Sequence, residues 1–392
     1  MKVLIVGAGL AGLRTAESLR GAGFAGEITL VGDEPYFPYN RPPLSKDALA
    51  NGLEIADLEF KRRESVADVT WIFDDSATST DYQQRGVLLK SGRLESFDVL
   101  VAATGIRPRT LNVPGAEKSK FSLRNFAEAQ ELRTSMLGVQ RIVIVGAGFI
   151  GCEIAATARK LGIDVAVVAA DPEPMFRPLG AEFGHAMKHR HEAHGVSFHM
   201  NAKIAGYLGG ESATGVSLES GEEILGDLLI EAIGSLPNTE WLAGGSLDLK
   251  DGVLVDSSMR ATAPSDVSIY AVGDVARYAF DLFDSTPRRI EHWNLPTETG
   301  RRAGKSIAHF LHTGEVLAES VNFVPSFWSD QYEDNLQSFG MPGIADSINV
   351  VEGDLMGDCV VEYLRGNKVV GVVGVNTSAK LAPYRKSFQE TN

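Results

Sequence analysis

The chain has 392 residues, with 37 Lys and Arg against 51 Asp and Glu, so its formal net charge is −14 and its length predicts two or three domains. An acidic chain without an apolar run of the roughly 18 residues that span a bilayer disfavours nucleic acid and membranes as partners. Its two cysteines, Cys152 and Cys359, form no CxxC pair, which argues against a disulfide framework or a cysteine-ligated metal and favours a cytoplasmic protein.

The N-terminal segment predicts a βαβ unit that binds a dinucleotide. Residues 3–6 form a continuous apolar run, which is typical of a strand buried on both faces of a parallel sheet. Helix-forming residues then continue to Gly23, and a second strand is predicted at 27–33. The turn between the first strand and the helix carries a G-x-G-x-x-G motif, formed by Gly7, Gly9 and Gly12. These glycines suit a tight turn, the close approach of a pyrophosphate, and close packing of helix on strand, in that order.

The end of the second strand offers a ribose ligand. Asp33 stands where a carboxylate can accept hydrogen bonds from the ribose of an adenosine. Its neighbour Glu34 is also acidic, so the role can shift by one position. The alternative is an ordinary solvated carboxylate in a loop.

The same motif recurs 139 positions later. Residues 141–151 (RIVIVGAGFIG) repeat residues 2–12 (KVLIVGAGLAG), and a helix and a strand at 164–170 follow. The glycines of this second motif are Gly146, Gly148 and Gly151. Two dinucleotide sites predict FAD in one and NAD(P)H in the other, because a flavin needs a reductant.

Further likenesses between the two halves divide the chain into domains. Segments 97–109 and 226–238 both read as strands that end at a glycine, Gly105 or Gly234, followed by proline. We therefore predict an α/β fold with two Rossmann-like dinucleotide-binding domains and a small C-terminal α+β domain. The predicted boundaries are 1–110 with 241–315 for the FAD-binding domain, 111–240 for the NAD(P)-binding domain, and 316–392 for the C-terminal domain.

Several histidines gather in one region, at His185, His189, His191, His194 and His199. His185 and His189 are four residues apart and so would be neighbours on a helix. Because neither a cysteine nor an HExxH motif accompanies them, we expect no metal site and favour a polar helix face.

Four further motifs carry a family resemblance. PYNRPPLSKDAL (38–49), YAVGDVA (270–276), EHWN (291–294) and FWSDQY (327–332) occur in this order. Together they resemble the oxygenase-coupled ferredoxin reductases, the flavoprotein family of putidaredoxin reductase, rubredoxin reductase and the apoptosis-inducing factor. The resemblance implies a glutathione-reductase-like fold, with FAD at the first glycine motif and the nicotinamide cofactor at the second.

The resemblance also implies roles for single residues. Lys46 would stabilise the reduced flavin, and Glu153 would hold Lys46 and help place the nicotinamide. The alternative for Glu153, a helix carboxylate stabilised by the dipole, is compatible with this role, which is favoured. Asp274 would hydrogen-bond the ribityl chain of FAD. The remaining residues expected to line the FAD are Arg41, Thr104, Gly105, Arg124, Trp293 and Trp328, although the two tryptophans could be core residues.

The choice between NADH and NADPH is open at one place. After the strand at 164–168, the family's NADH-preferring members carry a glutamate, whereas this chain has Ala169, Ala170 and Asp171. No arginine for a 2′-phosphate stands there either. NADH is favoured, because Asp171 can reach a ribose and would repel a phosphate.

The implied activity is transfer of electrons from NAD(P)H through FAD to a [2Fe–2S] ferredoxin, which serves a cytochrome P450 or a Rieske oxygenase. Basic residues near EHWN are candidates for a docking patch, namely Arg288, Arg289, Arg301, Arg302 and Lys305. The alternatives are rubredoxin reduction or a flavin-bound, NADH-sensing signalling protein like the apoptosis-inducing factor. A disulfide reductase is disfavoured, because residues 40–43 contain no cysteine.

Overall fold

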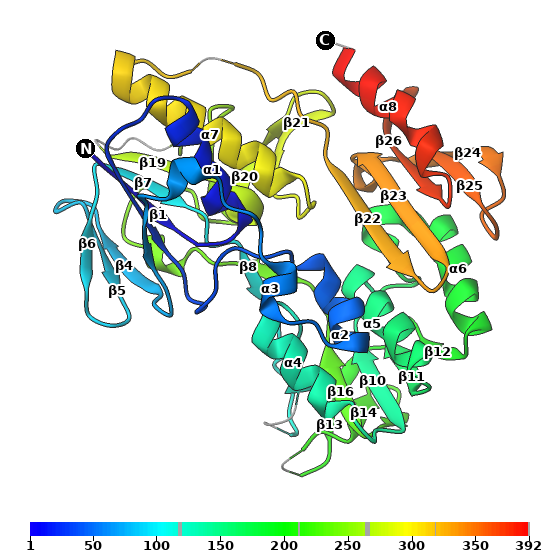
Figure 1. Cartoon of the computed structure of the whole chain (residues 1–392). Coiled ribbons are helices and arrows are strands. Elements are labelled where there is room, and N and C mark those ends of the chain that lie inside the picture. The colour runs from blue at the N-terminus through cyan, green and yellow to red at the C-terminus, as the bar shows by residue number, and fades with distance from the viewer. Residues whose placement is uncertain (117–119, 211, 263–266, 318, 391–392) are drawn as a thin grey trace.

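The computed structural model describes residues 1–116, 120–210, 212–262, 267–317 and 319–390. Figure 1 shows three groups of elements. The first is a sheet with helices α1 and α7, the second is a sheet with α5, and the third is a C-terminal sheet that lies beside α6. This is the predicted fold class, with two doubly wound α/β units and a small α+β unit.

The first sheet is a parallel sheet of five strands in the order β19-β7-β1-β2-β3. Strand β1 lies at its centre, and Val3, Leu4 and Ile5 are fully buried. The edge strand β19 is the last of the five in the chain, more than 160 residues after β7, with which it pairs. The strands are β1 (Lys2–Val6), β2 (Glu27–Val31), β3 (Thr70–Ile72), β7 (Val99–Ala102) and β19 (Ser268–Ala271).

The second sheet repeats this plan in the order β12-β11-β10-β16-β9, again with all strands parallel. Strand β10 takes the central place that β1 has in the first sheet, and Ile142, Val143 and Ile144 are fully buried. The strands are β9 (Lys120–Phe121), β10 (Arg141–Val145), β11 (Asp164–Val168), β12 (Val196–His199) and β16 (Leu228–Glu231).

Short strands, most of them in antiparallel pairs, extend each half and join the two halves. The joint is the pair of β8 and β17, which places Arg107 opposite Leu236. One three-stranded sheet extends each unit, and a third contains β20 and β21. The strands are β4 (Ala77–Asp81), β5 (Gly86–Leu89), β6 (Leu94–Ser96), β8 (Ile106–Pro108), β13 (Ile204–Leu208), β14 (Gly215–Leu218), β15 (Glu223–Leu225), β17 (Ser235–Pro237), β18 (Val253–Leu254), β20 (Ala276–Phe280) and β21 (Asp284–Arg288).

The C-terminal unit is an antiparallel sheet in the order β22-β23-β26-β25-β24. Strands β25 and β26 form a hairpin whose turn holds Gly366 and Asn367. This sheet shares a core with the second α/β unit, in which Phe183 of α6 and Tyr363 of β25 are buried together. The strands are β22 (Ser326–Gln331), β23 (Asp334–Gly340), β24 (Ser347–Gly353), β25 (Cys359–Arg365) and β26 (Lys368–Val375).

Helices cover the sheets and end where the sequence indicated. Gly23 and Gly162, both with positive φ, follow the first helix of each α/β unit. Helix α7 packs closely on α1, because Gly300 and Gly304 leave no side chain between the two backbones. The helices are α1 (Leu10–Gly21), α2 (Asp47–Asn51), α3 (Ile55–Leu58), α4 (Phe126–Ser135), α5 (Phe149–Lys160), α6 (Phe176–Ala193), α7 (Leu295–Thr313) and α8 (Ser378–Glu390).

Candidate functional site

The first glycine motif forms a tight turn between β1 and α1. Gly7 has a φ of +118°, and a Cβ there would lie 2.1 Å from the carbonyl oxygen of Ala103. A Cβ at Gly12 would lie 2.1 Å from the carbonyl oxygen of Gly7. At Gly9, in contrast, a Cβ would meet nothing within 4 Å. The first and third glycines are therefore required by the fold, whereas the second leaves open space at the N-terminus of α1, where backbone amides and the helix dipole attract phosphate.

The second motif has the same geometry between β10 and α5. Gly146 has a φ of +107°, and its Cβ would lie 2.2 Å from the carbonyl oxygen of Ala232. A Cβ at Gly151 would lie 2.2 Å from the carbonyl oxygen of Gly146, while Gly148 is open. Two separate helix N-termini are thus shaped for a pyrophosphate.

One large cavity, of about 770 Å³, extends from the first glycine motif. Most predicted FAD residues line it, namely Gly7, Gly9, Asp33, Arg41, Lys46, Thr104, Gly105, Arg124, Asp274, Trp293 and Trp328, and Glu153 joins them. The other predicted residues do not line this cavity, namely Gly12, Gly146, Gly148, Gly151, Asp171 and Gly234.

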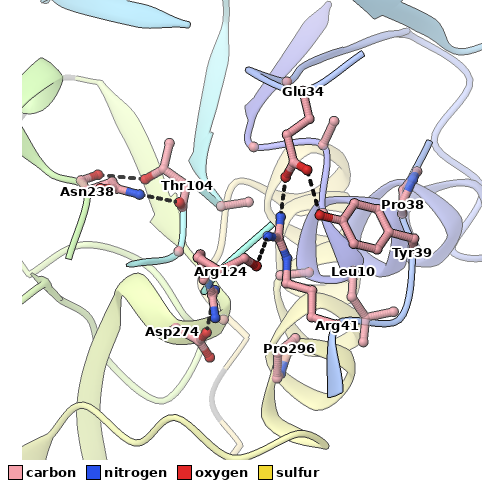
Figure 2. A pocket seen from close by; sticks show the side chains of 18 of the residues that line it. Leu10, Glu34, Pro38, Tyr39, Arg41, Thr104, Arg124, Asn238, Asp274 and Pro296 are labelled. Atoms are coloured by element: carbon pink, nitrogen blue, oxygen red, sulfur yellow. Dashed lines mark hydrogen bonds and ion pairs between the residues drawn. The ribbon is translucent and has the colours of Figure 1, made fainter. Parts of the chain in front are cut away.

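At the end of β2, the structure separates the two acidic neighbours. The carboxylate of Glu34 forms an ion pair with Arg41 and accepts a 2.6 Å hydrogen bond from the hydroxyl of Tyr39 (Figure 2). Asp33 is exposed and also lines the cavity, so it is the carboxylate of the two that keeps its oxygens available for a ribose. Sequence reasoning missed Tyr39, which is buried beside the PYNRPP segment and whose pKa is raised by burial.

A second ion pair lies deeper in the cavity. Arg124 Nη2 is 3.1 Å from Asp274 Oδ2, and Figure 2 shows the two side chains facing each other. Burial raises the pKa of Asp274 although the charge of Arg124 opposes the shift. Burial and the nearby charge of Arg41 lower the pKa of Arg124. Both groups are therefore short of solvation, which a polar ligand would supply.

The two glycine-ended turns meet beside this pair. Thr104 Oγ1 donates to the carbonyl of Asn238 at 2.6 Å, and the side-chain amide of Asn238 donates back to the carbonyl of Thr104 at 3.0 Å (Figure 2). Gly105 and Gly234 both have positive φ, at +61° and +98°. Asn238 was not predicted, although it ends the segment that matches the one holding Thr104.

The predicted pair of Lys46 and Glu153 is formed. Lys46 Nζ lies 2.8 Å from Glu153 Oε1, and both side chains are largely buried. Ser45, which sequence reasoning missed, donates to Glu153 Oε2 at 2.5 Å. The segment before α2 thus brings two neighbouring donors to one carboxylate at the start of α5.

Two tryptophans and a histidine close one side of the cavity. The rings of Trp293 and Trp328 meet edge to face at 4.8 Å, and the indole of Trp293 donates to Asn40 at 3.2 Å. Trp293 is partly exposed, so it is not a core residue. His292 also lines the cavity; burial lowers its pKa to about 4, and its buried Nδ1 has no partner among the described residues.

Two expectations about charge and histidine need correction. Arg289 forms ion pairs with Asp251 and Glu291, and Arg302 is buried and bound to Glu319, so these doublets are not a free basic patch. Arg288 is likewise bound to Asp284, and exposed Arg301 lies 3.8 Å from Glu298. Some of these acidic partners are near in sequence, such as Asp284 for Arg288 and Glu298 for Arg301. Others are more distant, such as Asp251 for Arg289 and Glu319 for Arg302.

Among the histidines, His185 and His189 lie on exposed α6 positions as expected, with ring nitrogens 3.1 Å apart. His191 is instead fully buried. No group of three metal-ligating side chains occurs within the described ranges. The helices that the structure describes also include none long and apolar enough to cross a membrane.

The first cavity fits FAD. It combines an open helix N-terminus at Gly9, a free ribose acceptor at Asp33, an orphaned nitrogen on His292, and a volume suited to a large cofactor. A buried polar atom without a partner is costly, and a ligand would satisfy it. The fold and these two phosphate-binding turns define a two-dinucleotide oxidoreductase.

Comparisons with known proteins agree with that class. Residues 1–300 match the family model for pyridine nucleotide-disulphide oxidoreductases, and residues 326–392 match the reductase C-terminal model. The chain belongs to the pyridine nucleotide-disulphide oxidoreductase family, and it uses FAD and NAD(P)H as its members do. Both buried cysteines are free, so the disulfide chemistry of the family name is not built into the described part of this chain.

Three similar proteins illustrate the match. Rhodocoxin reductase of Rhodococcus erythropolis is 34% identical over 96% of this chain and 86% of its own length. The ferredoxin–NAD(+) reductase subunit of the benzene 1,2-dioxygenase system of Pseudomonas putida is 30% identical over 97% of this chain and 90% of its own. The solved covalent complex of putidaredoxin reductase with putidaredoxin has a TM-score of 0.89, 32% identity, and coverage of 99% of this chain and 93% of that one.

Proposed function

We propose that the chain is an NAD(P)H:ferredoxin reductase that serves a cytochrome P450 or Rieske oxygenase system. The observation that carries this proposal is that the ion pair of Lys46 and Glu153 lies in the wall of the FAD cavity. Relatives that match over most of their length, among them a reductase subunit of a dioxygenase system, also support it. When bound, FAD would supply the capacity to take up a hydride from the nicotinamide and to release electrons one at a time. The remaining chemistry belongs to side chains of this chain.

The residues that hold the FAD are proposed from the cavity. Gly7, Gly9 and Gly12 shape the pyrophosphate turn, and Asp33 accepts from the ribose. The remaining proposed contacts come from Arg41, Thr104, Gly105, Arg124, Asp274, Trp293 and Trp328.

Lys46 and Glu153 are the proposed catalytic pair. A cation held at a fixed place in a largely buried site can stabilise negative charge that arrives with a hydride. Glu153 fixes Lys46 and presents a carboxylate beside the second glycine motif, where the nicotinamide cofactor would enter.

The second dinucleotide site is proposed to take NADH. Gly146, Gly148 and Gly151 would hold its pyrophosphate, with Gly234 in the facing turn. Asp171 follows β11, and an acidic group there favours a ribose hydroxyl over a phosphate. Two free thiols and a nicotinamide reductant favour a cytoplasmic setting. We also propose the domain boundaries 1–110 with 241–315, 111–240, and 316–392, which the strand order of the sheets supports.

The proposal is tested with the purified holoenzyme. Stopped-flow absorbance would follow flavin reduction by NADH and by NADPH, and steady-state assays would then compare ferricyanide, a panel of [2Fe–2S] ferredoxins, and rubredoxin as acceptors. Fast turnover with at least one ferredoxin is expected. Turnover with rubredoxin alone would favour the rubredoxin reductase alternative. A long-lived complex with NADH and slow turnover with every acceptor would favour a signalling protein and contradict the proposal.

A further inference from the structure

Strand β22 carries two buried polar side chains where a strand ordinarily buries apolar ones. Phe327, Ser329 and Gln331 alternate along the strand and all point inward, and Ser329 and Gln331 are each only 1% exposed. Buried polar groups are normally retained only with hydrogen-bond partners, so these two side chains require a polar connection through the core.

That connection begins at Glu153 and leads away from the cavity. Ser329 Oγ lies 2.6 Å from Glu153 Oε1, and Gln331 Nε2 lies 3.0 Å from Ser329 Oγ. His191 Nε2 of α6 lies 2.7 Å from Gln331 Oε1. Tyr332, which is partly exposed, places its hydroxyl 3.3 Å from His191 Nδ1. We call Ser329, Gln331, His191 and Tyr332 the β22 network.

The chemistry of these groups fixes the direction of every hydrogen bond. The carboxylate of Glu153 can only accept, so the Ser329 hydroxyl donates to it and must itself accept from the amide nitrogen of Gln331. The carbonyl oxygen of Gln331 then faces His191, which must carry its proton on Nε2. Nδ1 is therefore an acceptor, and the hydroxyl of Tyr332 donates to it. The hydrogen bonds that link the four residues therefore all run toward Glu153, and the second hydrogen of the Gln331 amide faces the sulfur of Met175.

The state of His191 agrees with this direction. Its side chain is fully buried, and burial lowers its pKa to about 4. A neutral imidazole has one donor and one acceptor nitrogen, which is what the network requires. The edge-to-face contact of the His191 ring with Tyr332 at 5.1 Å holds the imidazole in place.

We propose that the β22 network holds the carboxylate of Glu153 in the orientation that binds Lys46, so that Ser329, Gln331 and His191 are positioning residues for hydride transfer. Glu153 Oε2 is held by Ser45, but Oε1 is shared between Lys46 and Ser329. Without Ser329, the carboxylate loses the donor that opposes its rotation. This inference rests on the proposed role of Lys46 and Glu153.

The test uses holoenzyme variants Ser329→Ala and Gln331→Met, which break the network at two points. The rate constant of flavin reduction at saturating NADH is expected to fall about tenfold, since small misplacements at a reacting site cost one to two orders of magnitude. The KM for NADH is expected to stay nearly constant, because the network touches neither glycine motif. Ser329→Thr keeps the hydroxyl and should restore the rate.

Two controls separate positioning from loss of structure. Ser338 of β23 is also fully buried, and its hydroxyl has no hydrogen-bond partner within the described ranges, so Ser338→Ala should leave the rate unchanged. The double variant Ser329→Ala/Gln331→Met should be no slower than Ser329→Ala alone, because residues that act as a unit are not additive. Flavin content and the flavin absorbance spectrum should match the wild type in every variant.

The outcomes distinguish the two levels of the proposal. If Glu153→Gln slows flavin reduction but Ser329→Ala and Gln331→Met do not, the positioning inference is wrong and the proposed role of Glu153 stands. If Glu153→Gln leaves the rate unchanged, the proposed role itself fails. Additive losses in the double variant, or slowing by Ser338→Ala of the same size, would also overturn the inference.

Discussion

Lys46, just before α2, forms an ion pair with Glu153 on the first turns of α5, at 2.8 Å. The two residues come from the first and the second α/β unit, so this contact joins the two proposed cofactor sites. A cation and a carboxylate held together in a largely buried place form a fixed electrostatic feature rather than a solvated surface pair.

Removing the cation should therefore slow the chemical step. Lys46→Met keeps most of the side-chain volume, and we expect it to lower the rate constant of flavin reduction by NADH by about ten- to a hundredfold, because a preorganised charge is lost. Lys46→Arg should retain part of the rate. Stopped-flow absorbance at the flavin band measures both. A Lys46→Met enzyme that is reduced at the wild-type rate would contradict the proposed role.

The open second glycines should separate cofactor binding from folding. Gly9 and Gly148 both have extended φ and ψ values, and a Cβ at either meets nothing within 4 Å, so the backbone accepts a side chain there. We expect Gly9→Val to fold but to be purified with little flavin, because the side chain occupies the phosphate space.

The matched variant is Gly148→Val, which should retain flavin and lose affinity for NADH. Flavin content by absorbance and thermal unfolding are the measurements. Gly7→Ala is the opposite case, since its Cβ would clash with Ala103 at 2.1 Å, and it should destabilise the fold itself. Full pigment in Gly9→Val would argue against FAD at the first motif.

The nicotinamide preference should depend on Asp171 and Arg177. Arg177 is highly exposed and lies 3.3 Å from Asp171. The carboxylate of Asp171 therefore repels a phosphate and also forms an ion pair with the arginine that could otherwise bind one. We expect Asp171→Ala to raise kcat/KM for NADPH relative to NADH by about tenfold, which corresponds to about 1.4 kcal/mol. Adding Arg177→Ala should remove this gain. An unchanged ratio in Asp171→Ala would show that the preference is set elsewhere.

His191 should make stability depend on mildly acidic pH. Burial lowers its pKa to about 4 from 6.5, so the unfolded chain binds a proton between these values that the folded chain does not. Stability is thus unaffected by His191 above pH 6.5 and falls as the pH decreases toward 4. His191→Gln removes the titrating group but keeps an amide donor.

The difference in the free energy of unfolding between wild type and His191→Gln should fall by about 2–3 kcal/mol over this range. Denaturant unfolding at a series of pH values, with excess FAD throughout, measures it. Parallel curves for the two proteins would contradict the prediction. Loss of activity in His191→Gln at neutral pH would bear on the β22 network instead.

The local sequence was enough to predict the buried parallel strands and the strand–helix turns of this protein. The apolar runs of β1 and β10 and the two glycine motifs predicted the two α/β units, because a buried parallel strand and a tight strand–helix turn each need particular residue types at fixed spacing. The four family motifs added residues that line one cavity, including Arg41 and Asp274.

Apart from the predicted pair of Lys46 and Glu153, tertiary structure decided which distant groups meet. Arg289 looks like part of a free basic patch in sequence, yet Asp251, which lies 38 residues away in the chain, binds its side chain. His191 looks like one of several surface histidines, yet it is buried against Gln331, which lies 140 residues away in the chain. The physical reason is that periodicity and turn chemistry act over a few residues, whereas solvation and charge depend on what the fold packs beside each side chain.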